Sequence, residues 1–71
     1  MFAGEPIDID VLRLRHEFLT RPDLRLSSQT VALMLDISRR RAERLLESLA
    51  REGFLQSESN GDFRRGVARL T

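Results

Sequence analysis

The sequence predicts a small domain that is mainly α-helical and ends in a β-hairpin. Apolar residues recur at helical spacing in three segments, and each segment follows a residue type that caps helices. After Gly53 the pattern changes to two short runs on either side of Asn60-Gly61, which is typical of a hairpin. With 71 residues the chain has room for one such domain. We place it at residues 8–71, behind an N-terminal arm of residues 1–7.

The first helix is expected to begin at a cap on Asp8 or Asp10 and to end near residue 20, because Pro22 discourages its continuation. Arg15 falls in the middle of the broad apolar stripe of this helix. Its side chain is expected either to lie over the rim of the core or to form a buried ion pair or a partner contact. The link of residues 23–26 is extended and can pair as a short strand.

Two further helices follow. Ser27 or Ser28 is expected to cap a helix of residues 29–35, and Ser38 a helix of residues 39–52, because serine oxygens accept hydrogen bonds from the first free N–H groups. One core is expected from the apolar residues of the inner faces: Leu12, Phe18, Leu26, Val31, Leu35, Ile37, Ala42, Leu45, Leu46, Leu49 and Leu55.

The C-terminal segment is expected to form two strands. Asn60-Gly61 favours a two-residue type I′ turn between them, which would place Arg64 and Arg65 near the tip of the hairpin. Side chains of the returning strand would close the sheet: Val67 or Ala68, and Leu70.

Composition excludes several classes of protein. The chain has no cysteine and one histidine, so we expect no metal site, no cofactor and no catalytic nucleophile–histidine–acid set. The N-terminus has no charged region followed by an apolar run, and no 18-residue apolar window is present. The sequence therefore predicts a cytoplasmic protein that is not an enzyme and does not bind a membrane.

Charge is unevenly distributed along the chain. Residues 1–36 hold four arginines against six acids, a charge of −2, whereas residues 37–71 hold eight arginines against five acids, a charge of +3. All twelve basic residues are arginine, whose planar fork suits phosphate and guanine. Three arginines follow Ser38 directly, where the positive end of the helix dipole disfavours cations by about 0.3–1 kcal/mol each. This cluster indicates an anionic partner.

The run LSSQTVALMLDISRRRAERLLESLAREGFL resembles the core of the winged helix-turn-helix domains of bacterial transcriptional regulators. The resemblance covers residues 9–71, with Asp36 where the family often has glycine. It rests on residues at the helix starts, inner faces, turn and wing: Leu26, Ser27, Ala32, Leu35, Ile37, Ser38, Ala42, Leu46, Leu49, the run Glu52 to Leu55, and the run Val67 to Thr71.

The resemblance implies a DNA-binding protein that regulates transcription, with the third helix in the major groove and the hairpin wing on the backbone. The residues then expected at the DNA are Ser27, Ser28, Arg39, Arg40, Arg41, Arg44, Arg64 and Arg65. Arg40 and Arg44 would face base edges, Arg64 and Arg65 the backbone or the minor groove, and the others phosphates. The implied partner is double-stranded DNA. The chain is expected to bind it as a homodimer formed through helix one and the N-terminal arm. No small-molecule effector is expected. A protein-docking winged helix, or RNA binding by the same face, is the alternative.

Overall fold

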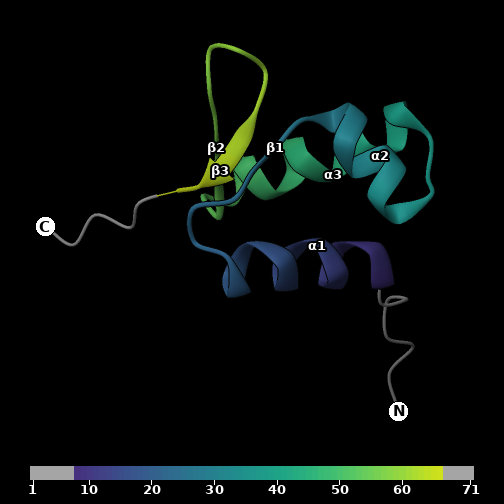
Figure 1. Cartoon of the computed structure of the whole chain (residues 1–71), viewed down its shortest axis with the longest axis horizontal. Coiled ribbons are helices and arrows are strands. Elements are labelled where there is room, and N and C mark those ends of the chain that lie inside the picture. The colour runs from purple at the N-terminus through teal and green to yellow at the C-terminus, as the bar shows by residue number, and fades with distance from the viewer. Residues whose placement is uncertain (1–7, 67–71) are drawn as a thin grey trace, which may run out of the picture.

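Three helices and a small antiparallel sheet make up the computed structural model, which describes residues 8–66 (Figure 1). This confirms the predicted fold class, and the layout is that of a winged helix. The elements are α1 Ile9–Thr20, β1 Arg25–Leu26, α2 Ser28–Leu35, α3 Arg39–Arg51, β2 Leu55–Ser57 and β3 Phe63–Arg65. The arm of residues 1–7 and the side chains predicted to close the sheet (Val67 or Ala68, and Leu70) lie outside the described residues.

Each helix begins at a side-chain cap. Asp8 caps α1 by accepting from the backbone N–H of Asp10 at 3.1 Å, and Ser27 caps α2 by accepting from the N–H of Thr30 at 3.2 Å. Ser38 caps α3 in the same way. In both places where the sequence left two candidate caps, the first of the two takes the position, so that α2 begins one residue earlier than predicted.

The ends of α2 and α3 both use left-handed backbone. Gly53 has a φ of +90° just after the end of α3, a conformation that glycine adopts without steric cost. Asp36, the residue that ends α2, has a φ of 57°. Aspartate adopts this conformation more readily than most residues, so the chain can turn tightly from α2 into α3 without glycine.

The sheet has the strand order β1-β3-β2, with both pairings antiparallel. Leu26 pairs with Phe63, and Leu55 pairs with Arg65, so these four residues share one face of the sheet. Leu26 and Leu55 are buried on that face against the helices. The pairing of β1 with β3 confirms that the link after α1 forms a short strand.

The predicted two-residue type I′ turn is wrong. Ser57 pairs with Phe63, so five residues, 58–62, connect the strands. A type I′ turn needs positive φ at both central residues, and here Gly61 has φ +95° whereas Asn60 does not have positive φ. The Asn60 side chain instead accepts from the N–H of Asp62 at 3.0 Å, which stabilises the wider loop.

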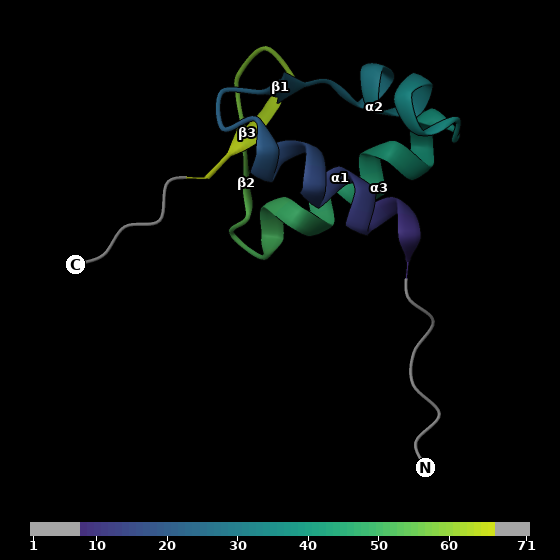
Figure 2. The ribbon, with the colours of Figure 1, turned by 60° about the horizontal axis from the view of Figure 1, so that its bottom comes forward.

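One hydrophobic core joins all three helices to the sheet. Its buried side chains are Leu14, Phe18, Leu26, Val31, Leu35, Ala42, Leu45, Leu46, Leu49 and Leu55, and half-buried Ile37 packs against them. The prediction that Leu12 belongs to this core is wrong, because its exposed fraction is 52%. Leu12 and Leu14 lie on different sides of α1, and Leu14 faces the core. Figure 2 shows α1 crossing in front of α3.

Candidate nucleic-acid interface

The exposed face of α3 carries a basic ridge of three arginines. Arg40, Arg44 and Arg51 are all exposed and lie on the side of the helix opposite its buried leucines. The spacing of four and seven residues keeps them in line, over roughly 16 Å of helix. Within residues 8–66 none of the three takes part in an ion pair. The ridge therefore presents positive charge that the described part of the chain does not neutralise.

The two neighbours of Arg40 have partners of their own. Arg39 pairs with Glu43 one turn later, with 3.6 Å between Nε and Oε2. The corresponding pair of Glu47 with Arg51 is not formed among the described residues. Glu47 is exposed on the same side of α3 as Arg44 and Arg51, so a carboxylate interrupts the basic ridge.

Arg41 turns away from this ridge toward the start of α1. Its Nη2 atom lies 3.0 Å from Oδ1 of Asp8 and 3.2 Å from Oδ2 of Asp10. Its Nε atom also donates to Asp10, at 3.3 Å. These carboxylates offset the repulsion between the guanidinium and the helix dipole of α3. Arg41, expected beside a phosphate, is therefore held by acids within the chain.

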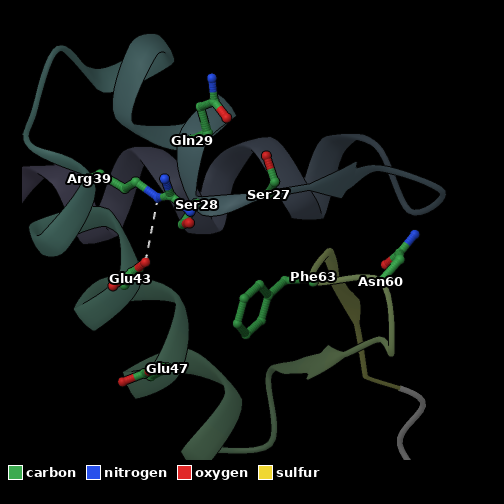
Figure 3. A pocket seen from close by; sticks show the side chains of 9 residues that line it. Ser27, Ser28, Gln29, Arg39, Glu43, Glu47, Asn60 and Phe63 are labelled. Carbon is green, nitrogen blue, oxygen red and sulfur yellow. Dashed lines mark ion pairs between the residues drawn. The ribbon is translucent and has the colours of Figure 1, made fainter.

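A hollow of about 360 Å³ lies between the start of α2, one side of α3 and the hairpin (Figure 3). Figure 3 shows the Phe63 ring reaching into it from the hairpin, opposite Glu43 and Glu47 on α3. The residues that line it are Ser27, Ser28, Gln29, Arg39, Glu43, Glu47, Asn60, Gly61 and Phe63. Two carboxylates stand here against one guanidinium, so this side of α3 is more acidic than the ridge.

The two serines expected at a phosphate have different surroundings. The Ser27 hydroxyl is engaged, because it accepts from the N–H of Thr30 and lies 3.0 Å from the Thr30 hydroxyl. Ser28 is the first residue of α2 and lines the hollow. The start of α2 therefore lies at the edge of the hollow, beside Arg39 (Figure 3).

The prediction that Arg64 and Arg65 lie near the hairpin tip is wrong. Both belong to β3, the central strand, and Arg65 pairs with Leu55 at the base of the hairpin. The wider loop is the reason, because it takes up the residues before Phe63. Glu58 bridges two arginines across the strands, with 3.0 Å from Oε2 to Nε of Arg64 and 3.3 Å from Oε1 to Nε of Arg25. The Arg64 Nε is buried, and the contact lacks hydrogen-bond alignment.

Phe54 is a platform for two guanidinium groups that sequence reasoning did not connect. The Cζ atom of Arg65 lies 4.5 Å from the ring centroid and that of Arg15 4.9 Å, both within the range of cation–π contacts. Arg15 also pairs with Glu52, and its side chain is 34% exposed. Of the alternatives open for Arg15, the structure thus shows an ion pair, half-exposed at the rim of the core.

Comparison of the chain with models of known protein families, with curated proteins and with solved structures gives no match. Among residues 8–66, no group of three or more His, Cys, Asp or Glu side chains could hold a metal ion. No helix within the same range is long and apolar enough to cross a membrane.

Proposed function

We propose that this chain is a small sequence-specific protein that binds double-stranded DNA and regulates transcription. The observation that carries the proposal is the pair of Arg40 and Arg44, exposed one turn apart near the start of α3 and unpaired within the described residues. An α-helix fits the major groove of B-DNA, where arginine can donate two hydrogen bonds to a guanine edge. A groove lined by phosphates would also stabilise cations at this end of α3.

The remaining expected contacts are assigned to the DNA backbone. Arg39 and Arg51 flank the reading pair along α3, and Ser28 can offer a hydroxyl and a backbone N–H at the start of α2. Arg41 and Arg64 would have to exchange acids for phosphates. Exposed ion pairs contribute only about 0.2–1 kcal/mol, so a polyanion can compete for Arg41 at little cost, whereas the Nε of Arg64 is buried and its pair with Glu58 is harder to exchange. Arg65 would reach the backbone from the base of the wing.

The proposal further describes a cytoplasmic protein of bacterial type that is not an enzyme and works without a cofactor or a small-molecule effector. It acts as a homodimer through α1 and the arm of residues 1–7. A dimer would offer two copies of α3 to successive major grooves, whose centres are about 34 Å apart on one face of the duplex.

A second candidate function rests on the hollow beside α3. Glu43 and Glu47 would repel phosphates there, whereas they could pair with a basic side chain of another protein, with Phe63 offering an aromatic face to the same cation. This arrangement favours a winged-helix module that docks a protein partner through α3 and the hairpin.

Binding to labelled DNA by three arginine variants tests the proposal. On a preferred site selected from random duplexes, Arg40→Ala and Arg44→Ala should each lose about 1–3 kcal/mol and relax preference at one base pair. Arg13→Ala is the matched control, because Arg13 is also exposed and makes no ion pair in residues 8–66 but lies on α1. Equal binding by all three variants would overturn the proposal.

Glu47→Gln separates the two candidate functions. If α3 faces DNA, removing this carboxylate lowers repulsion and raises the affinity for random duplexes. If the hollow docks a basic side chain of a protein, the substitution leaves the DNA affinity unchanged. Instead, the variant no longer binds an arginine-rich peptide that binds the wild-type chain.

A further inference from the structure

Helix α1 has a second apolar row that faces away from the core. Ile9, Leu12 and Leu19 are 64%, 52% and 59% exposed, and exposed His16 completes the row. The steps between these four positions are three, four and three residues, which keeps them on one side of an α-helix. The row covers about 15 Å of helix, nearly the full length of α1.

This row is distinct from the face of α1 that holds the domain together. Leu14 and Phe18 are fully buried, and Val11 packs against the same core. The core is thus satisfied without the outer row. An aliphatic row of this length on a small domain exposes apolar surface that water disfavours, and such rows mark contact surfaces.

We propose that the outer row of α1 binds the same row of a second copy, with the two helices antiparallel about a two-fold axis. The inference rests on the homodimer of the proposed function, to which it gives a face and a register. Spacing of three and four residues is that of the seam between two packed helices. The row is also symmetric about its midpoint: Ile9 lies opposite Leu19 of the second copy, and Leu12 opposite His16.

The antiparallel register is favoured over a parallel one for two reasons. A parallel pair would place the two His16 side chains directly against each other, whereas the antiparallel pair separates them and packs the apolar body of each imidazole on Leu12, with its polar tip at the edge of the seam. Antiparallel helices also align their dipoles favourably. Because the steps of three, four and three residues are the same in both directions, each side chain of the row meets a side chain of the second copy.

The size of the row predicts a weak dimer. Three aliphatic side chains, each already partly covered, supply less than the roughly 800 Å² per partner that a standard interface buries. Self-association should therefore appear only at high concentration in the absence of DNA.

Sedimentation equilibrium of the full chain without DNA, from about 10 to 500 μM, tests the contact. The wild-type chain should dimerise in this range, and Leu12→Glu should weaken the dimer at least tenfold. Leu33→Glu is the matched control, because Leu33 is 79% exposed but lies on α2. Circular dichroism verifies that both variants are folded. A wild-type chain that stays monomeric throughout, or equal weakening by the two variants, would overturn the proposal.

Disulfide trapping tests the register, and because the chain has no native cysteine, any disulfide must form between the introduced residues. Ile9→Cys mixed with Leu19→Cys should give a mixed disulfide on mild oxidation, whereas Leu19→Cys alone should give little. Efficient trapping of Leu19→Cys with itself would refute the antiparallel register. Neither experiment contains DNA, so its outcome is separate from that of the DNA-binding tests. A chain that forms this dimer but does not bind DNA would refute only the proposed function.

Discussion

Two leucines on the same helix provide a matched test of how α1 packs. Leu14 is fully buried, whereas Leu12, two residues earlier, is 52% exposed. Leu14→Ala removes buried methyl groups and leaves a cavity, which costs about 2–5 kcal/mol. Leu12→Ala removes the same atoms from a largely hydrated position and should cost less than about 0.5 kcal/mol.

The expected loss is large against the stability of so small a chain. At about 0.05–0.15 kcal/mol per residue, 71 residues give an unfolding free energy of about 4–11 kcal/mol. Leu14→Ala should therefore lower the urea midpoint strongly and reduce the melting temperature by at least about 8 °C. Unfolding followed by circular dichroism at about 1 μM keeps the proposed dimer out of the measurement. Equal midpoints for the two variants would show that α1 does not pack through its Leu14 face.

Two further substitutions test the start of α3. Ser38→Ala should lower the free energy of unfolding in urea by about 0.5–2 kcal/mol, because the Ser38 Oγ accepts a hydrogen bond from the N–H of Arg41 at 3.1 Å. Ser59→Ala, in the exposed loop, is the control. An equal effect of both substitutions would contradict the cap. Arg41→Ala should lower the free energy of unfolding by less than about 1 kcal/mol at low salt, because it removes the ion pairs with Asp8 and Asp10. This loss should shrink near 1 M salt, and a loss that salt does not change would argue against the ion pairs.

Local signals in the sequence predicted the helices well. Ser38 and Gly53 fixed the two ends of α3 to within a residue, because a cap and a left-handed glycine act on backbone groups next to them in the chain. The spacing of apolar residues by three and four positions in α3 likewise identified its buried face. Three helices, a hairpin and their order are therefore predictable from neighbouring residues alone.

Features that depend on distant residues could not be predicted in this way. The apolar stripe of α1 is so broad that the sequence does not distinguish the side that packs on the core from the outer row, and Leu12 was misplaced for that reason. The Asn-Gly signal was overridden by a hydrogen bond from the N–H of Asp62 to the Asn60 side chain and by the register of β3. The extended link of residues 23–26 was predicted to form a short strand, but its pairing with β3 was not predicted.

The three arginines at the start of α3 show the same limit in the candidate site. Their clustering suggested one shared anionic partner. In the structure Arg39 pairs with Glu43 on its own helix, and Arg41 reaches acids more than thirty residues away. Only Arg40 has no such partner among residues 8–66. The spacing of one turn could have indicated the first pair, but the second requires the packing of α1 across α3.

The salt dependence of binding by the wild-type chain tests the central claim most directly. Anisotropy of a labelled random duplex between 50 and 200 mM salt should show binding whose log K falls linearly with log salt, with a slope of about −2.7 for three backbone arginines to about −4.5 for all five. This corresponds to roughly 0.9 per phosphate contact for the arginines assigned to the backbone. A chain that does not bind duplex DNA at low salt, or whose binding is independent of salt, would contradict the claim that the α3 face meets DNA.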